Sequence, residues 1–249
     1  MSSFVTAFTE KCKFKTDLYN LEFPATILVF GEPKSGKTHF VLNLLKIIKS
    51  DFDEIVLYLG SKDTAPSFLE LIPNNQKPVI KILFNYNEDD LKKYYDKIED
   101  DQIKLIKAKK NPKRYLIVAD DIYSFPQLMK TNRQNPSVIE KLFANYRHLN
   151  LSIMITSQRL KQITPSLRGM FKYAFICSLG RKDIDELSKE NENVYFSKQD
   201  IIDSYEFVRK RDNALGHIFF INKDVPEKDR FQYITPSNQI EIIEPPKNI

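Results

Sequence analysis

Residues 26–38 read TILVFGEPKSGKT. It opens with a short, mainly apolar run that is typical of a buried strand, and the segment after it carries Phe40, Leu44 and Ile47 at helical spacing. Between the two, residues 31–38 fit GxxxxGK[ST], the pattern of a loop that binds phosphate groups between a strand and a helix. The sequence therefore predicts a P-loop.

The chemistry of a P-loop gives several of these residues a role. Glycine at both ends lets the backbone fold around phosphates, and the helix N-terminus supplies positive potential. Lys37 can then reach the β and γ oxygens, and Thr38 can hold Mg²⁺ through its hydroxyl. The alternative, a chance glycine turn before an ordinary helix, is disfavoured by the flanking strand and by a total of only six glycines. We expect ATP to contact Gly31, Glu32, Pro33, Lys34, Ser35, Gly36, Lys37, Thr38 and His39.

A pair of acidic residues follows another buried run. RYLIVADDIYSF places Asp120 and Asp121 directly after strand-forming residues, so both carboxylates emerge at the carboxyl edge of the sheet, where open α/β folds bind ligands. We interpret this as a Walker B motif in which Asp120 holds Mg²⁺ and Asp121 orients or deprotonates the attacking water. Taken alone, an Asp pair after a strand is explained equally well by a solvated turn. The P-loop upstream favours the functional interpretation.

The third motif is LSIMITSQR, an apolar strand that ends in Thr156, Ser157 and Gln158. A neutral amide at this point can contact the γ-phosphate and the attacking water, which makes Gln158 a candidate catalytic sensor. An ordinary loop after a strand is the commoner outcome for such a pattern by itself. Its order after the acidic strand favours the sensor.

The rest of the chain alternates buried runs with amphipathic helical segments. This alternation predicts an α/β fold with a mostly parallel central sheet covered by helices on both faces, the three-layer RecA-like arrangement. We expect one P-loop ATPase domain over residues 25–236, a peripheral N-terminal arm at 1–24 and a C-terminal tail at 237–249. The expected core strands are 26–30, 54–59, 114–119, 151–156 and 173–177. VIKILF is expected in a crossover, and HIFFIN and FQYITP are expected as the closing strands of the sheet. The expected helices are 37–48, 87–110, 138–148, 184–189 and 198–209.

Composition sets broad limits on compartment and partners. Lys and Arg total 38 against 33 Asp and Glu, so the net charge of +5 permits a polyanionic partner without requiring one. Cys12 and Cys177, the only cysteines, belong to no metal-binding pattern, which predicts a reducing compartment and no zinc. No apolar run approaches the roughly 20 residues that a membrane-spanning helix needs, and no signal-peptide core precedes the first charges. We expect a soluble, intracellular protein without a membrane span.

GEPKSGKT, LIVADD and NYRHLNLSIMITSQR followed by ITPSLR together resemble the FtsK/HerA superfamily, and above all its viral branch, the poxvirus-type genome-packaging ATPases of large DNA viruses and virophages. The resemblance covers residues 26–177, and the stretch 146–158 is its most discriminating part. It implies an ASCE-type P-loop NTPase that hydrolyses ATP with Mg²⁺ and packages viral DNA into a capsid. One departure is Asp121, because cellular members of the superfamily usually carry Glu there.

The resemblance also implies a ring, pentameric or hexameric, with ATP between subunits and an arginine finger inserted from the neighbour. Arg147 matches the arginine that the superfamily places near the subunit boundary, and Arg168 in PSLRGM is the second candidate. For either residue, a surface arginine on a helix is an equally good explanation. A capsid or portal-vertex protein would be a further partner. The resemblance places the protein in the host cytoplasm, in the viral factory, and leaves association with the virion open.

The DNA partner would be double-stranded and bound without sequence preference, because the sequence contains no recognisable sequence-reading module. The candidate phosphate contacts are the basic residues of 104–114 together with Lys130, Arg133 and Lys161, although a charge run is more often a solvated face. Three alternatives remain at this point: a conjugation-type or chromosome-pumping translocase, a small-molecule kinase, and a scaffold that binds ATP without hydrolysing it.

Overall fold

The computed structural model describes residues 14–15, 19–71, 78–84, 88–121, 137–210 and 216–246. This part of the chain is organised around a nine-stranded sheet in the order β11-β10-β9-β8-β3-β7-β6-β4-β5. The six strands from β8 to β5 are parallel to one another, and β9, β10 and β11 extend one edge in antiparallel fashion. The predicted mostly parallel sheet is confirmed.

The strands of this sheet are β3 (Thr26–Phe30), β4 (Glu54–Leu59), β5 (Val79–Leu83), β6 (Tyr115–Asp120), β7 (Leu151–Ser157), β8 (Tyr173–Ile176), β9 (Ile218–Asn222), β10 (Phe231–Ile234) and β11 (Ile240–Ile242). The helices are α2 (Lys37–Ile48), α3 (Ala65–Leu69), α4 (Glu88–Lys107), α5 (Val138–Asn145), α6 (Pro165–Gly169), α7 (Arg181–Asn191) and α8 (Lys198–Lys210). A two-stranded ribbon, β1 (Phe14–Lys15) with β2 (Glu22–Phe23), and the short 3-10 helix η5 (Leu160–Gln162) complete the elements used below.

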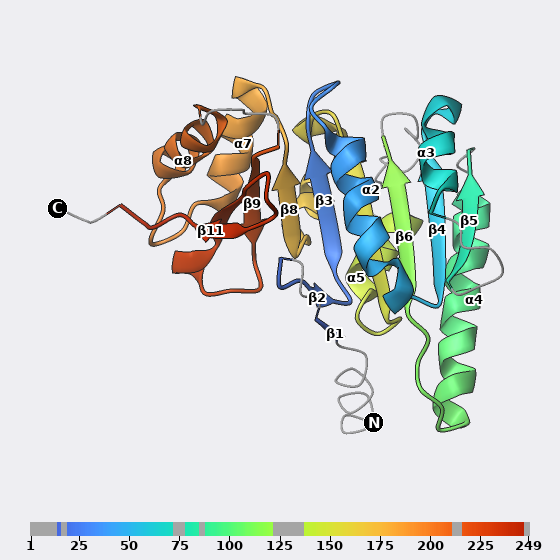
Figure 1. Cartoon of the computed structure of the whole chain (residues 1–249). Coiled ribbons are helices and arrows are strands. Elements are labelled where there is room, and N and C mark those ends of the chain that lie inside the picture. The colour runs from blue at the N-terminus through green and yellow to red at the C-terminus, as the bar shows by residue number, and fades with distance from the viewer. Residues whose placement is uncertain are drawn as a thin grey trace.

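Helices cover both faces of the sheet, as expected for a three-layer α/β fold (Figure 1). Alternate side chains of each central strand point to opposite faces. Ile27 and Val29 of β3 pack in one core with apolar residues of α2 and α3, whereas Leu28 and Phe30 pack in the other with residues of α4, α5, α6, α7 and α8. Each central strand is buried on both faces, which explains its nearly continuous apolar sequence.

The strand order places the functional motifs together. Strand β7 lies between β3, which leads into the P-loop, and β6, which ends in the acidic pair. This inserted strand is the additional strand of the ASCE class, and the RecA-like prediction is confirmed. Because the three strands are parallel, their carboxyl ends meet at one edge of the sheet, with Phe30 beside Ser157 and Ala119 beside Ile155.

The arm and the tail are more closely attached than the sequence suggests. Leu21 and Phe23, which we expected in a peripheral arm, are fully buried in the core that α2 shares. Residues of the expected tail form β11, which pairs with β10. The helices otherwise fall near their predicted positions; the predicted helix at 184–189 is longer, as α7, and that at 138–148 ends earlier, as α5. The domain boundaries at 24/25 and 236/237 stay predictions.

Candidate active site

The P-loop is held between the carboxyl ends of two strands. The Gly31 N–H donates to the Ser157 carbonyl at the end of β7, 3.1 Å away, and the Glu32 N–H donates to the Ser178 carbonyl after β8, also 3.1 Å away. Also on the β8 side, the Cys177 N–H donates to the Phe30 carbonyl at 2.8 Å. The start of the loop is therefore fixed by the ends of β7 and β8, which Gln158 and Cys177 directly follow.

Both glycines of the motif are required by local geometry. Gly36, at the start of α2, has φ 88°, in the left-handed region that favours glycine. A Cβ on Gly31 would lie 2.2 Å from Ser35 Oγ and 2.8 Å from Lys37 Cγ, so a side chain there would collide with the loop itself. The predicted reason for glycine, a tight fold of the backbone, agrees with these two positions.

Lys37 points into the concave side of the loop. Its ammonium donates to the carbonyl of Gly31, and also to that of Glu32 at 3.1 Å. Burial lowers the pKa of Lys37, and the charges of Cys177, Asp121, Asp120 and Glu32 oppose that effect. The lysine is thus desolvated and close to the acidic pair, as a residue that contacts a triphosphate must be.

One polar atom of the loop has no partner among the described residues. Ser35 Oγ is buried and makes no hydrogen bond, although a buried hydroxyl normally has a partner. It lies one residue before Gly36, at the N-terminus of α2, where a bound phosphate would supply acceptor oxygens. The orphaned hydroxyl therefore fits a phosphate group in this loop.

The two aspartates at the end of β6 have different environments. Asp120 is 4% exposed, and burial raises the pKa of its carboxyl, with a hydrogen bond from Thr156 opposing the shift and the charge of Asp121 adding to it. Asp121 has φ 55°, an uncommon left-handed conformation that Asp tolerates better than most residues. β6 ends at Asp120, and the two carboxylates have different partners, Thr156 for Asp120 and Gln158 for Asp121.

Thr156, which we did not single out from the sequence, connects the two aspartates. Its hydroxyl donates to Asp120 Oδ1 at 2.8 Å and accepts from the Asp121 N–H at 2.7 Å. The residue is fully buried on β7. Only the pairing of β6 beside β7 reveals this role, because a threonine in an apolar strand is unremarkable in sequence.

The predicted sensor and the predicted base lie in contact. Gln158 Nε2 is 3.2 Å from each carboxylate oxygen of Asp121. The structure therefore brings together Lys37 at the start of α2, Asp120 and Asp121 at the end of β6, and Gln158 directly after β7. Glu32, Pro33 and Gln158 also line a hollow of about 840 Å³ beside the loop, together with Arg159, Lys161, Gln162 and residues 180–183.

The donor set that we expected for Mg²⁺ is the hydroxyl of Thr38 and the carboxylate of Asp120. Hydroxyl and carboxylate oxygens are the hard ligands that Mg²⁺ prefers, usually with phosphate oxygens and water completing the shell. Thr38 is the second residue of α2, directly after Lys37, and Asp120 lies close enough for its charge to act on that lysine. The chemistry of these residues fits the ion.

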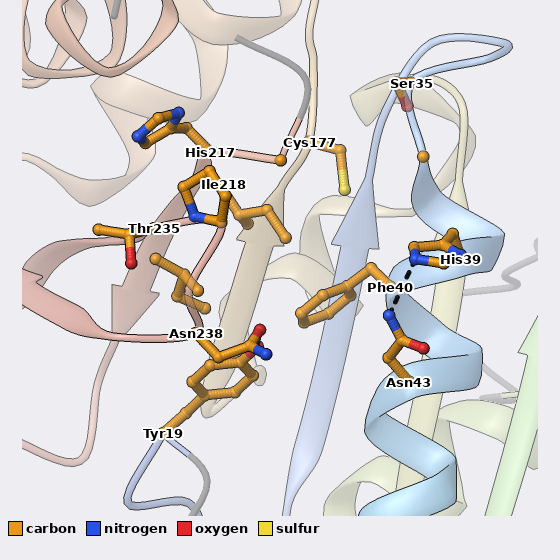
Figure 2. Close-up of a pocket in the computed structure, with 14 residues that line it drawn as sticks. Tyr19, Ser35, His39, Phe40, Asn43, Cys177, His217, Ile218, Thr235 and Asn238 are labelled. Carbon is orange, nitrogen blue, oxygen red and sulfur yellow. Dashed lines mark hydrogen bonds between the residues drawn. The ribbon is translucent and has the colours of Figure 1, made fainter. Parts of the chain in front are cut away.

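A second cavity, of about 400 Å³, opens on the other side of the loop (Figure 2). Its walls are the first turns of α2, with His39, Phe40 and Asn43, and the segments around β9 and β10, with His217, Ile218, Thr235 and Asn238. Tyr19 closes one end and donates from its hydroxyl to Asn238 Oδ1 at 2.8 Å. Ser35 and Gly36 also line this cavity, and with His39 they are the lining residues that the sequence motif identified. Phe40 and Asn43 follow the motif on α2, and the remaining lining residues lie far from the P-loop in the chain.

The two candidate finger residues differ in exposure. Arg147 is exposed and follows α5, just before β7 begins; its Nε donates to the Tyr146 hydroxyl at 2.8 Å. It lies at the amino end of a strand of seven residues whose carboxyl end carries Gln158, and such a strand spans roughly 23 Å. Arg147 is therefore remote from the nucleotide loop of its own subunit.

Arg168 has the opposite character, and the structure argues against a finger role for it. Its side chain is 3% exposed, and it forms ion pairs with Glu186 and Glu190 of α7. It also donates to the carbonyls of Leu160 and Ile163. A guanidinium with these bonds would have to break them to reach another subunit, so its geometry is that of an internal brace.

The predicted DNA contacts do not form one patch. Lys104, Lys107, Lys109 and Lys110 are exposed around the carboxyl end of α4, at the edge of the sheet opposite the P-loop (Figure 1). Lys161 lies on η5, beside the P-loop. Lys130 and Arg133 fall outside the described residues.

Comparison with known proteins agrees with this geometry. The profile of the family described as Poxvirus A32 protein matches residues 11–247, nearly the whole chain. The chain belongs to this family. The predicted resemblance to the poxvirus-type branch is thereby confirmed. Another relative, the uncharacterised protein 015R of Frog virus 3 (isolate Goorha), is 26% identical over 152 residues, which cover 60% of this chain but only 42% of 015R.

Two solved structures show the same fold as this member of the A32 family. The genome packaging NTPase B204 from Sulfolobus turreted icosahedral virus 2, in complex with ATP-gammaS, has a TM-score of 0.55 at 18% identity, covering 89% of this chain and 97% of B204. EssC (ATPases 2 and 3) from Geobacillus thermodenitrificans has a TM-score of 0.57 at 12% identity, covering 95% of this chain and 46% of EssC. At these identities the likeness establishes the fold.

Proposed function

We propose that this chain is an ATP-driven, DNA-translocating motor that packages viral double-stranded DNA into a capsid. The observation that carries the proposal is the convergence of Lys37, Asp120, Asp121 and Gln158 at one edge of an ASCE sheet in a member of the A32 family. The structural similarity to B204, a genome packaging NTPase that was solved with ATP-gammaS, supports the same assignment.

We assign each residue of the site a role in ATP hydrolysis. The loop N–H groups, Lys37 and Ser35 hold the phosphates, and Thr38 with Asp120 would hold Mg²⁺. The ion, when bound, neutralises charge on the β- and γ-phosphates. Asp121 accepts a proton from the attacking water or orients it, and the Gln158 amide, which contacts Asp121, fixes the position of that water. Asp121 and Gln158 can take up these roles from their mutual contact, because catalytic hydrogen bonds rearrange when a nucleotide binds.

The cavity beside α2 would hold the nucleoside. It begins at Ser35 and Gly36, so a nucleotide with its phosphates in the loop would extend into it. Phe40 and Ile218 offer apolar surface, while His39, Asn43 and Asn238 offer polar groups. A cavity of about 400 Å³ with apolar walls and a few polar groups suits a small organic ligand.

A ring, pentameric or hexameric, would supply the remaining part of the site. Arg147 cannot serve its own subunit, but in a neighbour it could enter the hollow between Glu32 and Gln158. Such a finger stabilises charge on the transferring phosphoryl group. The exposed lysines at the end of α4 would contact the DNA backbone, and recruitment to the capsid would place the ring at a portal-vertex protein in the infected cell.

The alternatives are less well supported. A conjugation-type translocase would share the site; among the described residues, no helix is long and apolar enough to span a membrane. The membership in the A32 family disfavours a small-molecule kinase. A scaffold that binds ATP without hydrolysing it would have no use for the contact between Gln158 and Asp121.

Displacement of a third strand from a linear DNA triplex tests the motor. With ATP and Mg²⁺, the chain should release the third strand at a rate that needs hydrolysis, and the Lys37→Ala variant should not. Release that proceeds equally with a non-hydrolysable analogue would contradict translocation. The Lys46→Ala variant, changed on the exposed side of α2, is the matched control.

A further inference from the structure

The turn that follows β7 is organised by one side-chain oxygen. Gln162 Oε1 accepts from the N–H groups of Gln158 and Arg159, at 3.2 and 3.1 Å, and lies 2.7 Å from Ser157 Oγ. Backbone N–H groups can only donate, so the atom that faces them must be the oxygen of the amide. Three consecutive residues thus contact a single acceptor that lies three to five residues downstream.

The same turn is closed from both ends. The Gln162 N–H donates back to the Arg159 carbonyl at 3.2 Å. Arg168 donates to the carbonyls of Leu160, the first residue of η5, and Ile163, which directly follows η5, at 3.1 and 2.7 Å. Because Arg168 is buried and paired with two glutamates of α7, this side of the turn is attached to the body of the protein.

The hydrogen bonds of this turn fix the backbone of Gln158 and thereby the direction of its side chain. Gln158 is the first residue after β7, so its backbone is no longer held by ladder hydrogen bonds to β3 or β6. Its N–H is bound by Gln162 instead, while its amide nitrogen reaches Asp121. Loss of the acceptor would remove the bond that holds the Gln158 N–H, and one of the bonds to the Arg159 N–H, while leaving the strand, the P-loop and Asp121 in place.

We propose that Gln162 is a positioning residue for hydrolysis, which acts by holding the turn that aims Gln158 at Asp121 and the attacking water. This inference rests on the proposed hydrolytic function. It assigns to Gln162 no contact with the nucleotide and no part in proton transfer. A displacement of about 1 Å in a positioned group can lower a rate by roughly 100-fold. The loss of Gln162 should therefore lower kcat.

The test is a double-mutant cycle in ATP hydrolysis, with Gln162→Met, Gln158→Ala and the double variant. Methionine keeps the length of glutamine but removes the acceptor. We expect Gln162→Met to lower kcat by roughly 10- to 100-fold, to change the Kd for ATP by less than about twofold, and to add little in the Gln158→Ala background, because the two residues act as one unit. Gln162→Glu, which keeps an acceptor oxygen, should restore most of kcat.

Several results would overturn the proposal. Wild-type kcat in Gln162→Met, or a loss that multiplies in full with that of Gln158→Ala, would show that Gln162 does not act through Gln158. If Gln158→Ala itself keeps full turnover, the hydrolytic assignment fails as well, so the two failures are distinguishable. Gln199→Met, an exposed position on α8, is the matched control, and thermal melting verifies folding. Gln162→Ala replaces Gln162→Met if the latter does not fold.

Discussion

The amide nitrogen of Gln158 lies 3.2 Å from both carboxylate oxygens of Asp121, although 37 residues separate the two in the chain. The contact joins the ends of two adjacent parallel strands, and it brings a neutral donor to the group that we assign as the base. Hydrolysis in this account depends on that pair, whereas binding depends on the P-loop.

Asp121→Asn and Gln158→Ala should therefore keep nucleotide binding and lose turnover. Removal of a general base or of a group that positions water costs roughly 10²- to 10⁴-fold in kcat. Steady-state hydrolysis together with equilibrium titration of a fluorescent ATP analogue separates the two effects. Equal weakening of binding and turnover in these variants would contradict the division of labour.

The charged carboxylate of Asp120 should lower the stability of the folded protein, although the same group supports metal binding. Burial raises the pKa of Asp120, so folding favours the protonated form. The stability that this provides is present below the pKa of the unfolded chain and is lost as pH rises through the folded pKa. Asp120→Asn, whose amide oxygen can still accept from Thr156, should therefore melt at a higher temperature than the wild type at pH 7, each kcal/mol corresponding to roughly 2–4 °C.

This advantage of Asp120→Asn should shrink as the pH falls towards 4, because the wild-type carboxyl then becomes neutral as well. The same variant should lose the Mg²⁺-dependent part of nucleotide affinity. Melting curves from pH 4 to 8, without nucleotide, provide the measurement. A variant that is less stable at every pH would show that the charge of Asp120 stabilises the fold.

Arg147 should act on the neighbouring subunit. Arg147→Ala assemblies should hydrolyse ATP slowly, and so should Lys37→Ala assemblies, which lack the P-loop lysine. Mixed assemblies of the two variants should recover part of the activity, because some interfaces then pair an intact P-loop with an intact finger. No recovery at any mixing ratio, in assemblies of the correct size, would exclude Arg147 as a finger in trans.

The cavity beside α2 should contribute to affinity for the nucleoside only. His39→Ala should raise the Kd for ATP and ADP by roughly 3- to 10-fold, the effect of losing a polar contact of about 1 kcal/mol. Tripolyphosphate, which has no nucleoside, should bind His39→Ala and wild type equally. If tripolyphosphate binding weakens to the same extent, His39 contacts the phosphates and the cavity has another use.

The sequence was sufficient for the fold because each central strand is buried on both faces and therefore appears as an apolar run. It also indicated Lys37, Asp120, Asp121 and Gln158 as candidate site residues. Lys37 belongs to the loop that follows one apolar run, and the others lie at the ends of two further apolar runs. Other parts of the site depend on tertiary contacts that leave no periodic signal. Thr156 is an ordinary strand residue until β6 is placed beside it, and Asn238 lines the cavity beside α2 from the far end of the chain.

Arg168 and Phe23 illustrate the same limit. The sequence PSLRGM gives no indication that the arginine is buried against α7, because the glutamates that pair with it lie 18 and 22 residues further on. Phe23 falls in the segment 1–24, which the sequence predicts to be a peripheral arm. The structure buries it through contacts with the ring of Phe52, which lies beyond α2.

Steady-state ATP hydrolysis with and without long double-stranded DNA, over a salt series, shows whether this chain is a DNA motor. We expect DNA to stimulate hydrolysis and the stimulation to fade as salt rises, because each phosphate contact releases counterions. Charge reversal at Lys107, Lys109 and Lys110 should reduce the stimulation without changing basal turnover, whereas reversal at Lys92 and Lys93, near the other end of α4, should not. Hydrolysis that is robust but indifferent to DNA at every salt concentration would contradict a DNA-translocating motor.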